Sequence, residues 1–356
     1  MSKLVAAFTA ALALSASANV AFAQGFYAGK TLTILVNYDA GGPTDTEARV
    51  LGRHISKHLA GAPGVIVQNM GGAAGLVGAK YLGEIAPRNG LTMGYLTAAA
   101  HRYFTNPDQF KPDFRTYQFV ALVPSGRIHY MRADVQPGLK QSTDLVKAQN
   151  LIVGGLGPDA PKDMSMRLTL DMLGVKYKYV TGYNSSAQAF LALQRGEISY
   201  YADSPADYLG KAAPLVEQGV LLPAFFDPGF DGKTFSVPKQ MRDLQMQPFQ
   251  EFYRAVRGRD PEGPLWEAYK TMLMVGGSMY RLLALPPGAP DEARDALRKA
   301  VLELNEDADY IAEARKTMGE SPEYVSSPDL NEVVQKGLSL DPQMRKFMQD
   351  YGKNGR

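Results

Sequence analysis

Glycine-rich turns are the part of this sequence best suited to chemistry. They stand where an apolar, β-branched segment gives way to a helix-forming one, at residues 38–43, 69–78 and 154–160. Glycine lets the backbone approach a ligand closely, while the free N–H groups and dipole of the next helix attract an anion. A single such turn is more simply a tight turn, but several in one chain favour a binding crevice for an anion.

Other reactive groups are scarce. The chain has no cysteine and four histidines, which excludes thiolate nucleophiles, disulfides and cysteine-based zinc sites. His54 and His58 have a spacing that zinc can use, but no third ligand is implied, so we interpret them as surface or half-buried residues. We find no P-loop and no nucleophile elbow. We therefore predict no catalytic residue, no metal and no cofactor.

Four features of the sequence have a second interpretation. Residues 155–160 fit the dinucleotide pattern G-x-G-x-x-A, but Pro158 and the mid-chain position argue against that site. Asp45 is explained as a residue that stabilises a helix start, and the alternative is a contact with a ligand hydroxyl or water. Arg281 could pair with a ligand carboxylate or form a structural ion pair. His101 and Arg102 could face either the crevice or solvent.

The elements that position these turns alternate between strand and helix. We expect strands at 31–36, 65–67, 91–96, 151–153, 177–180 and 198–202. Thr44 and Glu47 have the spacing of a capping box, which predicts the start of the first helix. The two blocks of alternation, near 30–120 and 150–220, predict two α/β lobes with parallel sheets covered on both faces.

Composition agrees with a globular, exported protein. The chain has 356 residues, a formal charge of +2 and 45% hydrophobic residues, which excludes a strongly basic nucleic-acid binder and a disordered chain. Residues 1–23 have an apolar core followed by Ala21-Phe22-Ala23, which is typical of a signal peptide cleaved near Ala23. We expect a mature protein that begins near Gln24 and is located in the periplasm.

At this point a family resemblance becomes visible. Its motifs are Ala40-Gly41-Gly42-Pro43-Thr44-Asp45, then Gly72-Ala73-x-Gly75-x-x-Gly78-Ala79, and finally Leu285-Pro286-Pro287-Gly288-Ala289-Pro290. The chain resembles the extracytoplasmic solute receptors of tripartite tricarboxylate transporters, also called Bug receptors, over nearly all of its mature length. The resemblance implies a fold like that of type II periplasmic binding proteins. In that fold two α/β lobes are joined by two crossing strands, with a ligand cleft between them.

The resemblance also implies lobe boundaries and site residues. Lobe 1 would comprise residues 24–124 and 280–356, and lobe 2 residues 125–279. The first two glycine loops would bind a carboxylate, and the second lobe would supply the opposite wall. The implied ligand-binding residues are Tyr38, Gly41, Gly42, Pro43, Thr44, Asp45, Gly71, Gly72, Ala73, Ala74, Thr97, Gly155, Asp159, Ala160, Tyr183, Asn184 and Asp203.

The implied function is capture of an organic carboxylate, either a di- or tricarboxylate or an aromatic acid, and its delivery to a membrane permease. We expect a monomer that is not an enzyme and has no nucleic-acid partner. The alternatives are an exported sensing module for a signalling partner and, less favoured, an exported hydrolase. The chain departs from the family at residues 182–185, Gly-Tyr-Asn-Ser, where the family often has Pro-Tyr-Lys-Gly and therefore a positive charge.

Overall fold

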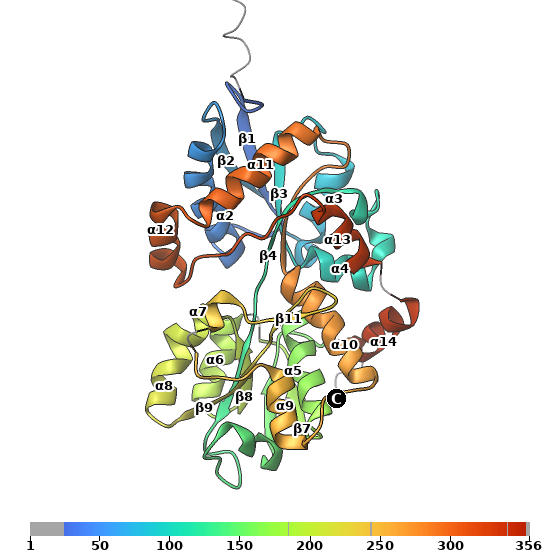
Figure 1. Cartoon of the computed structure of the whole chain (residues 1–356). Coiled ribbons are helices and arrows are strands. Elements are labelled where there is room, and N and C mark those ends of the chain that lie inside the picture. Colours follow the sequence, from blue (N-terminus) through green and yellow to red (C-terminus); the bar gives the residue numbers. More distant parts are fainter. Residues whose placement is uncertain (1–24, 184, 243, 340, 354–356) are drawn as a thin grey trace, which may run out of the picture.

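A computed structural model describes residues 25–183, 185–242, 244–339 and 341–353. The predicted signal peptide and Asn184 lie outside these residues. The described chain forms two α/β lobes stacked one above the other, each built on a five-stranded sheet (Figure 1). The prediction of two α/β lobes is therefore confirmed.

The sheet of lobe 1 has the strand order β2-β1-β3-β12-β4. Its strands are β1 (Thr31–Val36), β2 (Gly64–Asn69), β3 (Thr92–Thr97), β4 (Gln118–Val123) and β12 (Arg281–Leu285). β1 pairs in parallel with β2 and β3, but β12 runs antiparallel to both β3 and β4.

The sheet of lobe 2 has the order β7-β6-β8-β5-β9. Its strands are β5 (Ile128–Arg132), β6 (Leu151–Gly154), β7 (Tyr177–Val180), β8 (Tyr200–Asp203) and β9 (Leu221–Phe226). β5 runs antiparallel to its neighbours β8 and β9. The expectation of purely parallel sheets is therefore wrong. Each sheet is mixed because it includes a strand next to a crossing between the lobes.

Helices cover both sheets. Those of lobe 1 are α2 (Pro43–Ile55), α3 (Leu76–Glu84), α4 (Ala99–Thr105), α11 (Asp291–Leu304), α12 (Ala308–Met318) and α13 (Leu330–Leu338). Those of lobe 2 are α5 (Pro161–Met172), α6 (Ser186–Gln194), α7 (Pro205–Asp207), α8 (Ala213–Glu217), α9 (Phe249–Arg257) and α10 (Pro264–Leu273). A short hairpin, β10 (Gly229–Phe230) and β11 (Phe235–Ser236), completes lobe 2.

The chain passes between the lobes at two places. Residues 124–127 lead from β4 into β5, and Figure 1 shows this segment running from the upper to the lower lobe. The return passes through a π-helical turn, Met274–Ser278, into β12. The predicted boundaries at 124/125 and 279/280 remain predictions. The last helix, α14 (Pro342–Lys353), packs against α4 of lobe 1 and α10 of lobe 2, so it contacts both lobes.

Local sequence explains the start of α2, but not in the way the capping box predicts. The helix begins at Pro43, with Gly42 as its N-cap and no side-chain cap. Proline has no N–H to satisfy and a φ suited to the first helical position, so it moves the start upstream of Thr44. The Thr44 hydroxyl instead lies 3.0 Å from that of Thr97, and Glu47 accepts a hydrogen bond from Tyr95. The capping-box prediction is wrong.

One face of α11 is apolar at helical spacing, and its residues Ala293, Leu297, Val301 and Leu304 are all fully buried. They pack in one hydrophobic core with side chains of strands β1 and β4, so α11 covers one face of the lobe 1 sheet. Within the described ranges, no helix combines the length and the apolar character needed to span a bilayer.

Candidate ligand-binding cleft

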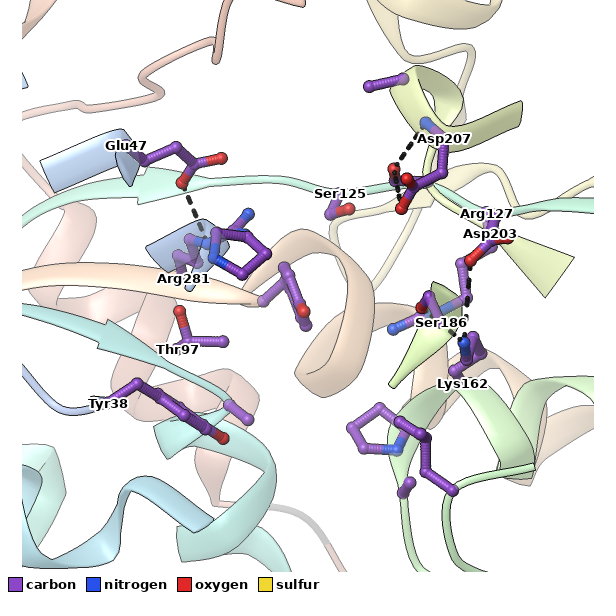
Figure 2. A pocket seen from close by; sticks show the side chains of 18 of the residues that line it. Tyr38, Glu47, Thr97, Ser125, Arg127, Lys162, Ser186, Asp203, Asp207 and Arg281 are labelled. Carbon is purple, nitrogen blue, oxygen red and sulfur yellow. Dashed lines mark hydrogen bonds and ion pairs between the residues drawn. The ribbon is translucent and has the colours of Figure 1, made fainter. Parts of the chain in front are cut away.

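A cavity of about 730 Å³ lies between the two lobes, lined by residues from both. Figure 2 shows Tyr38, Thr97, Glu47 and Arg281 on the lobe 1 side, across an open space from Lys162 and other residues of lobe 2. Several of the predicted site residues line this cavity: Tyr38, Gly41, Pro43, Ala74, Thr97, Asp159, Ala160 and Asp203. The glycine turns of both lobes thus meet at one cleft.

Other predicted residues lie outside the cavity lining. They are Gly42, Thr44, Asp45, Gly71, Gly72, Ala73, Gly155 and Tyr183. Most of them belong to the same loops as the lining residues. We interpret their role as shaping the loops, and Asp45 is an example.

Asp45 anchors the first glycine loop. It is buried, and its carboxylate accepts hydrogen bonds from the Gly41 N–H at 2.8 Å, from Arg49 Nε at 3.0 Å and from Asn69 Nδ2 at 3.0 Å. Burial opposes its ionisation, but the bonds from Arg49, Gly41 and Asn69 outweigh burial and hold the pKa of Asp45 below its usual value. The geometry supports the structural interpretation of Asp45. The Gly41 N–H is already used by this carboxylate.

The second glycine loop has a left-handed backbone. Gly72, Ala73 and Ala74 have φ values of 114°, 47° and 51°. Gly72 is favoured by its backbone angle, whereas Gly71 packs against Asp39: a Cβ there would displace the exposed Asp39 side chain and lie 3.0 Å from its backbone nitrogen. The loop presents Ala74 to the cavity.

Asn37, which the sequence analysis missed, joins these loops. Its buried side chain donates to the carbonyls of Gly75 and Thr97, both at 3.0 Å, and accepts from the Thr97 N–H at 2.9 Å. One amide therefore holds the second loop against the end of β3. A polar residue directly after a buried strand was the available signal.

Arg281 forms a structural ion pair that borders the cavity. Its Nε lies 3.0 Å from Glu47 Oε2, and the same carboxylate oxygen accepts from the Tyr95 hydroxyl at 2.7 Å. Glu320 lies nearby in the lining, and burial together with Glu47 raises its pKa to about 7. Of the two interpretations of Arg281, the structural ion pair is present in this structure.

The lobe 2 wall carries a lysine that the sequence analysis missed. Lys162, the second residue of α5, lines the cavity with its side chain 12% exposed. Its Nζ donates to Ser186 Oγ at 3.2 Å and to the Tyr201 hydroxyl, and lies 3.8 Å from Asp203 Oδ1. Burial lowers the pKa of Lys162. A cation in the first turn of a helix opposes the helix dipole, and that unfavourable placement was a usable signal.

Asp203 is held between Lys162 and a tyrosine. Its Oδ2 accepts a hydrogen bond from the Tyr130 hydroxyl at 2.8 Å. Burial raises the pKa of Asp203 to about 6, against the smaller opposing effect of Lys162. The carboxyl group that lines the cavity therefore changes charge near neutral pH.

Arg127 lines the same wall of the cavity and forms an ion pair with the buried carboxylate of Asp227. Its Nη2 donates to the Gly276 carbonyl at 2.8 Å, and its Nη1 lies 3.6 Å from Asp227 Oδ2. Asp227 also accepts from His129 and Tyr269 at 3.0 and 2.8 Å. Burial opposes ionisation of Asp227, but His129 and Arg127 hold its pKa below the usual value.

Contacts across the cleft join the lobes at one end. His101 Nε2 lies 2.9 Å from the Asp159 carbonyl, and Arg102 Nη1 lies 3.3 Å from Asp159 Oδ2. Arg102 lines the cavity, whereas His101 is buried beside it, and burial lowers the pKa of His101 to about 4. These residues therefore face the cleft region rather than open solvent.

The remaining histidines of lobe 1 have structural partners. His54 Nε2 lies 2.6 Å from Glu313, and His58 lies 3.1 Å from Glu303 and 2.8 Å from Asp307. His54 connects α2 to α12, and His58, in the turn that follows α2, connects that turn to α11 and to the residue that caps α12. Among the described residues, no group of histidine and acidic side chains has the arrangement of a metal site.

No protein-family model matches the chain. It is similar to two curated proteins. One is a UPF0065 protein of Agrobacterium vitis, 33% identical over 192 residues, which are 52% of this chain and 54% of the relative. The other is a UPF0065 protein of Cupriavidus necator, 30% identical over 231 residues, which are 61% of this chain and 64% of the relative. The similarity therefore spans between half and two thirds of these relatives.

Solved structures match over a longer range. A TctC solute-binding protein from Polaromonas superposes with a TM-score of 0.65 and 18% identity, covering 91% of this chain and 98% of the neighbour. An R. palustris protein with adipate superposes with a TM-score of 0.61 and 20% identity, covering 90% of this chain and 97% of the neighbour. The periplasmic binding protein BugD superposes with a TM-score of 0.59 and 18% identity, covering 92% of this chain and 99% of the neighbour. The expected fold is confirmed, and the neighbours are those that the sequence resemblance predicts.

Proposed function

We propose that this protein is an extracytoplasmic solute-binding protein that captures an organic carboxylate in the cleft and delivers it to a membrane permease. The observation that carries the proposal is the meeting of glycine-rich loops from both lobes at one cavity of about 730 Å³. The volume suits a small metabolite. Asp45 and Asp163 already accept the N–H groups of Gly41 and Gly157, so the donors for an anion are the remaining loop N–H groups and the helix N-termini behind them.

The neighbours support this proposal. Besides the structure with adipate, the protein MatC from Rhodopseudomonas palustris, described with bound malate, has a TM-score of 0.55 and 19% identity over 91% of this chain and 99% of the neighbour. BugD is described as a periplasmic binding protein. We propose the same location for this chain, after removal of residues 1–23.

A binding role fits the geometry better than hydrolysis. Ser165, His129 and Asp227 lie close together, which superficially resembles a catalytic triad. The Ser165 hydroxyl donates to Asp227 at 2.7 Å, however, and the two ring nitrogens of His129 face Asp227 and Tyr200. Ser165 and His129 are also fully buried. A nucleophile must contact its base and its substrate, so we propose that this cluster is structural.

The test is a thermal-shift screen of the mature protein with di-, tri- and aromatic carboxylates, followed by calorimetry of the hits. Ligand binding raises the apparent unfolding temperature by mass action. An acid should bind far more tightly than its methyl ester, since the ester loses the charge-assisted hydrogen bonds. Equal affinity for acid and ester, or no response to any carboxylate, would overturn the proposal.

A further inference from the structure

The last helix, α14, is joined to one lobe and packs on the other. It is separated from α13 of lobe 1 only by residues 339–341. The chain from the end of α13 to the start of α14 spans at most about 14 Å, so α14 cannot move far from lobe 1. Figure 1 nevertheless shows α14 beside α10 of the lower lobe. The helix is therefore a further link between the lobes, in addition to the two crossings.

Contacts with lobe 1 hold α14 against α4. Gln349 donates a hydrogen bond to the Thr105 carbonyl, and the guanidinium carbon of Arg345 lies 5.7 Å from the centre of the Phe104 ring. Met348 is fully buried in the hydrophobic core. Together with the short connection to α13, these contacts make α14 part of lobe 1.

The polar contacts of α14 with lobe 2 converge on Tyr351. Its hydroxyl donates to Asp171 Oδ2 at 2.7 Å, and its carbonyl accepts from Arg167 Nη2 at 2.6 Å. The centre of its ring lies 4.5 Å from the Arg167 guanidinium carbon. Arg167 and Asp171 lie one helical turn apart on α5 and are called here the dock.

The dock contains a buried charge that is poorly compensated. Arg167 is fully buried, and among the described residues its Nε and Nη1 have no hydrogen-bond partner. A buried guanidinium with unused donors is unfavourable, and movement of α14 away from α5 would return it to water. The hydration that is gained offsets part of the contacts that are lost. Release of Tyr351 therefore requires less free energy than its contacts alone would suggest.

The end of α14 also lies behind the cleft. A Cβ on Gly352 would be 3.5 Å from the Cβ of Asp159, in the glycine loop of lobe 2. Asp159 in turn contacts His101 and Arg102 of lobe 1. Rotation of lobe 2 away from lobe 1 would carry this loop and α5 away from α14.

We propose that α14 is a clasp that stays on lobe 1, holds lobe 2 through Tyr351 and must release the dock before the lobes separate. The strength of the dock then determines how often the empty cleft opens. The inference concerns the movement of the lobes, so it does not depend on which ligand the cleft binds.

Release of the clasp can be measured with a single thiol. The chain has no cysteine and residue 352 is buried, so the thiol of Gly352→Cys reacts with a soluble reagent only after α14 leaves lobe 2. In this background Tyr351→Phe should raise the reaction rate about 5-fold, because it removes the hydrogen bond to Asp171.

Tyr177→Phe is the matched control for this measurement. The Tyr177 hydroxyl donates to the same Asp171 carboxylate at 3.1 Å, but both residues belong to lobe 2. Its loss should lower the stability of lobe 2 and leave the reaction rate of the thiol at residue 352 nearly unchanged. Equal rates in Tyr351→Phe and Tyr177→Phe would overturn the assignment of the dock.

Separation of the lobes is measured independently, without any ligand. Spin labels at Lys299→Cys on lobe 1 and Arg195→Cys on lobe 2, both exposed positions, report the distance between the lobes. Tyr351→Ala removes the ring and the hydroxyl together and should shift the distribution toward longer distances. Lys346→Ala should not, because this exposed lysine of the same helix pairs with Asp350 of α14 itself.

Each combination of results decides the question. If the thiol at residue 352 stays unreactive in Tyr351→Ala, Tyr351 does not hold the lobes and the proposal is wrong. If the thiol reacts freely while the distances stay the same, α14 leaves without any separation of the lobes, and the clasp is overturned. A reactive thiol together with longer distances supports it. Should Tyr351→Ala not fold, Tyr351→Phe and Tyr177→Phe provide the same comparison. Failure of every carboxylate to bind would overturn the proposed function and leave the clasp intact.

Discussion

The two walls of the cleft are built alike but offer different chemistry. In lobe 1, Asp45 accepts the N–H of Gly41 and holds the loop that precedes its own helix. In lobe 2, Asp163 does the same for Gly157, at 2.7 Å, and also accepts from the Tyr179 hydroxyl at 2.8 Å. In both lobes an acidic residue in the first turn of a helix anchors a glycine loop.

Beyond this shared device the walls differ. Lobe 1 lines the cavity with residues of two glycine loops, with the paired cations Arg102 and Arg281 and with Glu47 and Glu320. Lobe 2 adds Lys162 and Arg127, whose nearest carboxylate oxygens lie at 3.8 and 3.6 Å. Backbone donors recognise any carboxylate. Side chains at fixed positions can discriminate between different ligands that each carry a carboxylate. We therefore infer that lobe 1 provides general anion binding and lobe 2 provides selectivity, and the predictions below test that division.

The largest effect is expected at Ala74, whose exposed side chain lines the lobe 1 wall. Ala74→Asp should lower carboxylate affinity by at least about 100-fold, because it places a like charge beside the bound anion. Ala74→Asn is the control: it has the same shape, tolerates the left-handed backbone and lacks the charge. Calorimetry would measure both. If Ala74→Asp folds and binds normally, the second loop is not the anion site.

A smaller loss of carboxylate affinity is expected when the hydrogen bonds that hold the first glycine loop are weakened. Asp45→Asn removes the charged acceptor shared by Gly41, Arg49 and Asn69, so carboxylate affinity should fall by about 10-fold as the first loop becomes less fixed. Asp309→Asn, at a carboxylate that is 87% exposed, should change nothing. If binding by Asp45→Asn equals that of wild-type protein, the anchor does not shape the site.

The lobe 2 wall should make binding of a carboxylate depend on pH. Burial raises the pKa of Asp203 to about 6, so lowering the pH from 8 toward 6 protonates this carboxyl and removes the negative charge nearest Lys162. Asp207 and Lys211 also act on Asp203, with opposite signs. Affinity for the carboxylate should therefore rise several-fold over this range, with proton uptake on binding.

Calorimetry in buffers of different ionisation enthalpy would detect that uptake. Asp203→Asn should remove the part of the uptake that comes from this carboxyl and leave the part that comes from Glu320, whose pKa burial raises to about 7 in the same cavity lining. An unchanged pH profile in this variant would contradict the assignment to Asp203.

The smallest signal is the change of shape. The lobes are joined by two crossings, so a ligand that contacts both walls should favour a closed form. Small-angle scattering at saturation with the tightest-binding carboxylate should give a smaller radius of gyration than the unliganded protein. An unchanged radius of gyration at saturation would contradict closure by a ligand that contacts both walls.

The fold was largely predictable from the sequence because local signals and topology agree. Alternating apolar strands and glycine turns located β1, β6 and β7 to within a residue or two. β5 and β9 were not predicted from the sequence, and the mixed sheets differ from the parallel ones expected. Strand direction depends on where the chain crosses between lobes, which is set by contacts distant in sequence rather than by local pattern.

The candidate site was predictable at the level of loops rather than residues. The sequence predicts the turns but does not distinguish Ala74, which lines the cavity, from its neighbour Ala73, which does not. The sequence shows that residues 182–185 lack a positive charge, but not that Lys162 supplies one beside that loop. The lysine comes from the start of another helix, 3.2 Å from Ser186. Proximity between segments is a property of the folded chain.

The insertion of β12 between β3 and β4 has a consequence for how the chain folds. The strands of lobe 2 form one continuous stretch of sequence, from Ile128 to Phe226, so that sheet can pair as soon as the stretch exists. The lobe 1 sheet has no such independence, because β3 and β4 are joined only through β12, which begins at Arg281. Closing so long a loop is slow. We therefore expect lobe 2 to acquire protection from hydrogen exchange first during refolding, and the central strands of lobe 1 to acquire it last.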